Sequence, residues 1–306
     1  MSSYFEVKQN GLSQAQTMTA YLGGSAFQTV LDNPITAYRQ FVQQLVKDKH
    51  GNLIDPKIAR TEANKIFIKH PVSASMSGLF PRLVGVGFKR IPKFWSLLAI
   101  SYFMGEDGEI GLLAATGASI LSAPFINPIR MIEKQQRAYF KTEGKQLSVI
   151  EVIKRSQKYN FKPLFRGTIP LMGHSLASAT TGLAGQPQLE KYIRTKLGDS
   201  GYFGKFACGL IASSIVTPIY VLMTNPLSRL EVIMQTSSID KKPISFTSAC
   251  KELVKDSASY GLRGAFRGQG LGIVKGIISL TTFHQGRLFL TDYFKEYNIK
   301  HDLVPK

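Results

Sequence analysis

The chain has 306 residues, 44% hydrophobic and 19% charged, and its 38 basic against 20 acidic residues give a net charge of +18. This charge predicts an acidic partner, either nucleic acid or anionic lipid. The two cysteines, Cys208 and Cys250, provide neither a disulfide framework nor a metal site. Sequence motifs of catalysis or cofactor binding are absent. We therefore expect no enzymatic activity, no resident cofactor and no metal.

The pair Asn-Pro occurs three times, each time between an apolar stretch and an amphipathic one. The copies are Asn33-Pro34, Asn127-Pro128 and Asn225-Pro226, with the prolines 94 and 98 residues apart. This recurrence predicts three repeats of about a hundred residues. The amphipathic stretches contain little glycine, so we expect helices kinked at Pro34, Pro128 and Pro226 rather than ended there.

A second shared element follows each proline by about forty residues and is aligned on a glycine. Two copies read Phe165-Arg166-Gly167 and Phe266-Arg267-Gly268, and the first copy has Gly78. An apolar stretch long enough to cross a membrane starts at each glycine, and another precedes each Asn-Pro pair. The predicted membrane helices cover residues 17–45, 79–103, 110–140, 168–196, 204–236 and 269–294.

Small and polar residues recur through these apolar segments. This pattern favours a helical bundle around a polar interior over isolated membrane anchors, with a soluble helical protein as the alternative. The connections 45–75, 134–166 and 229–267 hold 22 basic and 9 acidic residues. By the positive-inside rule they face the negatively charged compartment, which is the matrix for an inner mitochondrial membrane.

These features resemble the mitochondrial carrier family, whose signature P-x-[DE]-x-x-[KR] is followed by an aromatic-basic-glycine element. The resemblance covers nearly the whole chain. It implies an all-α, multi-pass membrane protein: a six-transmembrane-helix barrel of pseudo-threefold symmetry with short helices on the matrix surface. We expect a single domain over residues 1–306, with repeats at about 17–103, 110–197 and 204–295 and polar termini at 1–16 and 296–306.

In this family the acidic residue of each signature pairs with a basic residue of the next repeat and closes a gate on the matrix side. The acidic positions here hold Thr36, Arg130 and Ser228, and the basic positions hold Arg39, Glu133 and Glu231. Only Arg130 and Glu231 can form an ion pair, in reversed polarity. Thr36 with Glu133 and Ser228 with Arg39 could share hydrogen bonds. Bracing positions after the signatures hold Gln43, Arg137 and Gln235.

Substrate contact points of the family map to Gly85, His174 with Ser175, and Lys275. An ammonium in a membrane cavity favours an anion. Anionic lipid, with cardiolipin as the expected species, is predicted at the starts of the helices that follow the glycines. There an aromatic ring, a guanidinium and free helix amides meet at Phe165, Arg166, Gly167, Phe266, Arg267 and Gly268.

Three functions are consistent with these features. Because the gate positions have lost most of their charge pairs, we favour a non-transporting accessory subunit of a larger inner-membrane complex. The alternative is an active carrier that exchanges a small anionic metabolite by alternating access. A nucleic-acid-binding protein would require a soluble chain with its basic residues on one exposed face. We therefore expect membrane lipids and complex subunits as partners, and no nucleic acid.

Overall fold

The computed structural model describes residues 12–45, 53–88, 110–179, 186–197, 201–236 and 244–301. This part of the chain is helical and contains no β-strand. The elements are α2 (Gln14–Gln44), α3 (Pro56–Lys69), α4 (Pro71–Met76), a helical segment at 79–88, α6 (Ile110–Glu143), α7 (Val149–Gln157), η1 (Lys162–Phe165), α8 (Thr168–Ala179), α9 (Gln186–Leu197), α10 (Gly201–Thr236), α11 (Phe246–Tyr260), α12 (Leu262–Ala265) and α13 (Gln269–Lys300).

Three of the four longest helices, α2, α6 and α10, continue past their Asn-Pro proline as the sequence predicts. The expected boundaries differ at the ends of the chain, where α2 begins at Gln14 and α13 runs to Lys300. The start of α2 at Gln14 is explained by Ser13, which forms a capping box with Gln16. Gln16 also donates to Asn298 Oδ1 at 2.7 Å. Residues expected in polar termini therefore extend two paired helices.

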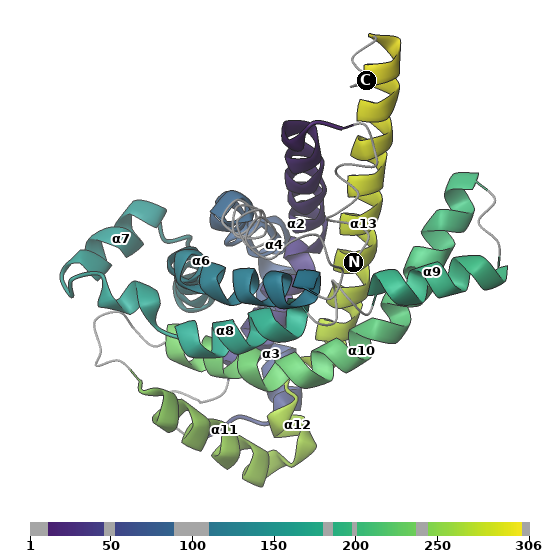
Figure 1. The fold of residues 1–306 in the computed structure, drawn as a ribbon. Coiled ribbons are helices and arrows are strands. Elements are labelled where there is room, and N and C mark those ends of the chain that lie inside the picture. Colours follow the sequence, from purple (N-terminus) through teal and green to yellow (C-terminus); the bar gives the residue numbers. More distant parts are fainter. Residues whose placement is uncertain are drawn as a thin grey trace.

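The long helices contact one another in a closed circuit. In Figure 1, α2 and α13 lie side by side, and α6, α8 and α10 extend across the view. Successive contacts join α6 to α8, α8 to α10, α10 to α13 and α13 to α2. Arg82, in the helical segment 79–88, contacts Asp32 of α2 and Glu133 of α6, which places that segment between these two helices. Helices of all three repeats thus meet.

The shorter helices α3, α7 and α11 each contact the long helix of their own repeat. Each contact encloses a small hydrophobic core, for example Val42 with Ala63 in the first repeat, Ile132 with Val152 in the second and Leu230 with Ala249 in the third. Side-chain caps start these helices at Asp55, Ser148 and Ser245. Three small cores of this kind occur among the described residues.

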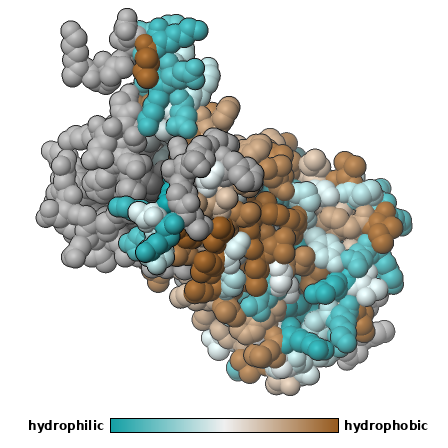
Figure 2. All heavy atoms as spheres, turned by 90° about the vertical axis from the view of Figure 1, so that its right-hand side faces the viewer, coloured by the Kyte–Doolittle hydropathy of each residue, from teal (hydrophilic) through white to brown (hydrophobic). Residues whose placement is uncertain are grey.

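One described helix, from Phe206 to Thr236 within α10, is long and apolar enough to span a membrane. Its exposed side chains include Ile215, Ile219 and Met223. Figure 2 shows hydrophobic side chains gathered over the middle of one face of the molecule, with hydrophilic ones above and below. The predicted helices 79–103 and 168–196 lie partly outside the described residues. The six-helix barrel accordingly remains a proposal.

The three aligned glycines take the same backbone conformation. Gly78, Gly167 and Gly268 have φ of +69°, +81° and +77°, a region that disfavours side chains. A helix begins one residue after each of them. A Cβ on Gly78 would lie 3.0 Å from Glu133 Cγ and 3.1 Å from Arg137 Nε. Glycine is therefore needed both for the turn and for the close approach of α6.

We expect Gly78→Ala to lower the free energy of unfolding by about 1–2 kcal/mol, because alanine disfavours positive φ, and by more where Arg137 is displaced. Gly270→Ala is the matched control, since Gly270 is exposed and a Cβ there meets nothing within 4 Å. The measurement is thermal unfolding in detergent of variants that also carry Cys250→Ser, because Cys250 is partly exposed. It is monitored with a thiol-reactive dye that labels the buried Cys208 when it becomes exposed. Equal melting temperatures for both variants would contradict the prediction.

Candidate functional site

The asparagines of the three Asn-Pro pairs are completely buried. Asn33 donates to Ser75 O at 2.6 Å, and Asn127 donates to Leu164 O at 3.0 Å and Arg166 O at 3.1 Å. Each of these two amides therefore holds the turn that precedes the aligned glycine of its own repeat. Asn225 differs, because its buried Nδ2 has no hydrogen-bond partner.

Side chains ten residues after each asparagine link the repeats. Each donates to the amide oxygen of an asparagine in another repeat. The pairs are Arg137 with Asn33 at 2.8 Å, Gln235 with Asn127 at 2.7 Å and Gln43 with Asn225 at 3.4 Å. Repeat 2 thus reaches repeat 1, repeat 3 reaches repeat 2, and repeat 1 reaches repeat 3. We call these six side chains the bracing ring.

The bracing ring also binds the backbone. Each bracing side chain donates to the carbonyl of the residue before the aligned glycine. The contacts are Arg137 to Ser77 O at 3.0 Å, Gln235 to Arg166 O at 2.9 Å and Gln43 to Arg267 O at 3.5 Å. The same donor and acceptor positions are therefore used three times among the described residues.

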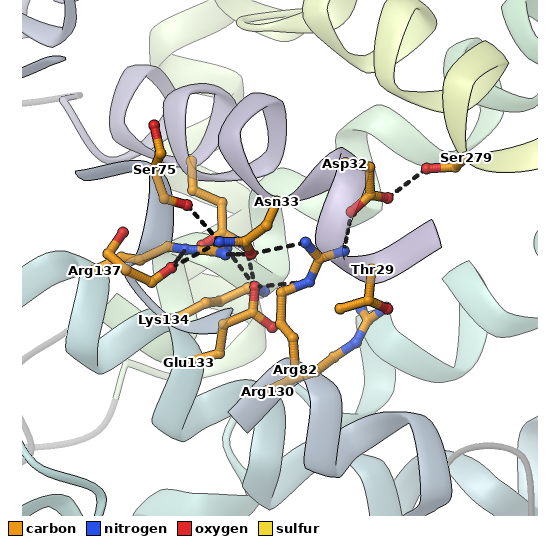
Figure 3. A network of polar contacts seen from close by, with 12 residues as sticks. Thr29, Asp32, Asn33, Ser75, Arg82, Arg130, Glu133, Lys134, Arg137 and Ser279 are labelled. Atoms are coloured by element: carbon orange, nitrogen blue, oxygen red, sulfur yellow. Dashed lines mark hydrogen bonds and ion pairs between the residues drawn. The ribbon is translucent and has the colours of Figure 1, made fainter. Parts of the chain in front are cut away.

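Repeats 1 and 2 are further joined by a buried network of charges, shown in Figure 3. Arg82 lies 2.7 Å from Asp32 and 3.7 Å from Glu133, and Arg137 is paired with Glu133 one turn away on α6. Ser279 of α13 donates to Asp32. Sequence reasoning missed Asp32 and Arg82. The available signal was an acidic residue inside an apolar segment, which is costly unless it is paired.

Among the gate positions, Arg130 and Glu231 are in contact. Arg130 Nη1 lies 3.2 Å and 3.1 Å from the two carboxylate oxygens of Glu231. Lys134, which the sequence reasoning did not single out, lies 2.8 Å from Glu231 Oε1. Glu231 is nearly inaccessible and holds two cations of another repeat. Lys134 is one turn from Arg130, so helical spacing could have identified it.

Neither of the two hydrogen bonds that the remaining gate positions could share is formed. Thr36 Oγ1 is buried without a hydrogen-bond partner, because Glu133 is engaged by Arg137 and Arg82. Arg39 donates to Asn225 Oδ1 at 2.8 Å instead of pairing with Ser228. In both cases a charged or amide partner competes better than a hydroxyl.

The proposed substrate contact points fall on three different elements. Gly85 lies in the helical segment 79–88, where a Cβ would be 3.2 Å from Ile129. His174 Nε2 is 3.1 Å from Tyr220 Oη, and Ser175 follows it on α8. Lys275 of α13 is partly exposed and is attracted by Asp32. Their role in substrate binding remains a prediction.

The two arginines predicted to bind lipid are largely buried. Arg267 is only 2% exposed and donates to Asp256 at 2.9 Å and to Ile54 O at 2.8 Å, so its guanidinium is used inside the protein. Arg166 is 8% exposed; burial lowers the pKa of its guanidinium, and Tyr159 opposes that shift. The ring of Phe165, in contrast, is about half exposed to solvent.

The charged side chains of a second buried cluster all come from repeat 3. Asp256 of α11 lies 2.6 Å from Arg229 of α10 and 2.9 Å from Arg267. Arg267 also donates to Leu45 O at the end of α2 at 3.2 Å. The cluster therefore ties α10, α11 and the turn before α13 to the first repeat. Arg229 and Asp256 were not identified from the sequence, because neither falls on a signature position.

Comparison with known proteins gives a partial likeness to a carrier protein. No protein family model matches the chain. A stretch of 162 residues is 24% identical to a protein described as mitochondrial substrate carrier family protein ucpB from Dictyostelium discoideum. The match covers 52% of this chain and 51% of that protein, so the chain matches about half the length of this curated relative. This likeness supports a relationship to mitochondrial carriers.

Isosteric substitutions in the bracing ring should have unequal effects. Asn127→Asp replaces an amide that donates to two carbonyls with a carboxylate that repels them, so we expect a loss of about 1–3 kcal/mol. Asn225→Asp replaces an Nδ2 without a partner and puts a carboxylate beside Arg39, so we expect little loss or a gain. Melting temperatures from the thiol-dye assay test this. Equal destabilisation by the two variants would refute the bracing geometry.

For the Glu231 cluster we expect Glu231→Ala to be more damaging than Arg130→Ala. The first change leaves Arg130 and Lys134 without their carboxylate and should cost about 3–5 kcal/mol, whereas the second leaves Lys134 in place. The charge swap Arg130→Glu with Glu231→Arg should recover stability only in part, because Lys134 then faces an arginine. Adding Lys134→Glu to the swap is the control. Single variants that melt like the wild type would contradict the cluster's stabilising role.

Proposed function

We propose that this chain is a carrier-fold protein of the mitochondrial inner membrane, with three repeats forming a six-helix pseudo-threefold barrel. The bracing ring supports this proposal, because it joins equivalent positions of successive repeats in cyclic order. The likeness to a mitochondrial substrate carrier family protein supports the location. The basic connections would face the matrix by the positive-inside rule.

We further propose that the protein is a non-transporting accessory subunit of a larger inner-membrane complex. The observation that carries this proposal is the burial of the charges between repeats. Arg137 and Glu231 are at most 1% exposed, and both bind side chains of another repeat. Alternating access would separate these contacts in every cycle. Because Glu231 holds two cations where a gate pair has one, opening would leave three charges unpaired in a poorly solvated site. The arrangement favours a static bundle.

The alternative function is exchange of a small anionic metabolite. Lys275 favours it, because the described part of the chain offers its ammonium neither a hydrogen bond nor an ion pair. Partly exposed side chains of His174 and Ser175 belong to the same set of predicted contact points. Membrane lipids, cardiolipin above all, are proposed partners in both cases, with exposed Phe165 as one contact.

Two measurements separate the functions. We expect the chain, solubilised from mitochondrial membranes in a mild detergent, to comigrate with a large complex on a native gel. Purified protein in liposomes should show no anion exchange above empty liposomes. Migration as a small species, together with anion uptake that Lys275→Ala abolishes, would overturn the accessory role and establish the carrier. Lys154→Ala, at an exposed position on α7, is the control for general loss of positive charge.

A further inference from the structure

Two neighbouring side chains of α13 are buried with unused hydrogen-bonding capacity. Gln285 is 8% exposed, and Thr281, one turn earlier on the helix, is 4% exposed. Among the described residues, neither amide atom of Gln285 has a hydrogen-bond partner, and the hydroxyl of Thr281 has none either. Buried polar groups are almost always hydrogen-bonded, because an unbonded one loses its contacts with water and gains nothing in return. These two side chains therefore need a further partner.

The neighbouring helices leave a small space beside Gln285. α10 contacts both α9 and α13 (Figure 1), and its Gly209 faces the amide of Gln285. A Cβ on Gly209 would lie 3.4 Å from Gln285 Nε2 and 3.8 Å from Glu190 Oε1 of α9. These are ordinary van der Waals distances, so the glycine leaves space for about one methyl group, which is close to the size of a water molecule. Side chains of two repeats thus face one small space.

The chemistry of the surrounding groups determines what this space can bind. Glu190 is 3% exposed and pairs with Arg194 of its own helix, so this pair contributes no net charge that would attract a free ion. The carboxylate of Glu190 can only accept hydrogen bonds, whereas the amide of Gln285 has one accepting and one donating atom. A metal ion cannot accept from that amide, and an anion cannot donate to the carboxylate. Water both donates and accepts, so it fits all of these groups.

We propose that a buried water molecule binds beside Gly209 and bridges Gln285 of α13 to Glu190 of α9. The Thr281 hydroxyl is a third partner, and a buried water typically makes about three hydrogen bonds. Gln285 lies about 25 Å along α13 from Gly268, at 1.5 Å per residue. The water therefore joins repeats 2 and 3 far from the bracing ring. Such a water would stabilise a static bundle and a carrier alike.

Substitutions at the site have opposite expected effects with and without the water. Gly209→Ala improves helix propensity and makes only ordinary contacts, so in a dry interface it should raise the melting temperature by about 2–4 °C. With the water present, the new methyl group displaces it, and we expect a fall of about 2–6 °C. Gln285→Met would remove an unbonded amide from a dry interface and stabilise the protein. Because it instead breaks the bridge, we expect a fall of about 2–4 °C.

The matched control is Thr282→Val, because the hydroxyl of Thr282 donates to Ile278 O of its own helix at 2.7 Å. Thr281→Val, at the neighbouring position, should lower the melting temperature by about 2–4 °C, and Thr282→Val by less than about 1 °C. Melting is followed by helical circular dichroism in detergent, since the dye-reactive Cys208 adjoins Gly209.

A crystallographic map that shows ordered water provides the direct measurement. We expect a density peak within hydrogen-bond distance of Gln285 and Glu190 in the wild type, and none there in Gly209→Ala. An unchanged or higher melting temperature for Gly209→Ala or Gln285→Met would overturn the proposal. So would a wild-type map that shows waters elsewhere in the protein and none at this site.

Discussion

Three backbone carbonyls determine how the repeats fit together. Each precedes a glycine in the left-handed conformation, at a turn where one helix ends and another begins. A buried carbonyl without a hydrogen bond is costly, and here each one accepts from a long side chain of another repeat. The same side chains bind the asparagines beside the prolines. One set of hydrogen bonds therefore stabilises the turn, the residues beside the proline and the contact between repeats.

The three interfaces are built differently around this common pattern. Between repeats 1 and 2 the bracing residue is an arginine, and Asp32, Arg82 and Glu133 surround it with charge. Between repeats 2 and 3 the brace is an amide pair, reinforced by the bonds of Glu231 to two cations. Between repeats 3 and 1 the brace is longest, and Arg267 adds bonds to the end of α2. The three interfaces therefore use equivalent positions with different chemistry.

Much of the helix pattern could be predicted from recurring residues, because proline and glycine constrain the backbone directly. The contact between Arg130 and Glu231 followed from the gate positions that the family resemblance implies, together with charge complementarity. Partner choice was less predictable where several groups compete. Glu133 binds Arg137 on its own helix and Arg82 across the interface, which leaves Thr36 without it. The signature positions indicate which side chains lie close together. Which of these side chains form hydrogen bonds depends on whether stronger donors are nearby.

The neutral brace between Gln235 and Asn127 has an electrical consequence. Two amides carry no net charge, so separating them moves no charge through the membrane potential. Displacing the Arg137 side chain from both Asn33 and Glu133 would move a full positive charge, at a cost of about 2.3 kcal/mol for each 100 mV it crosses. The brace between repeats 1 and 2 therefore contains a charge on which a membrane potential can act, and the amide brace between repeats 2 and 3 contains none.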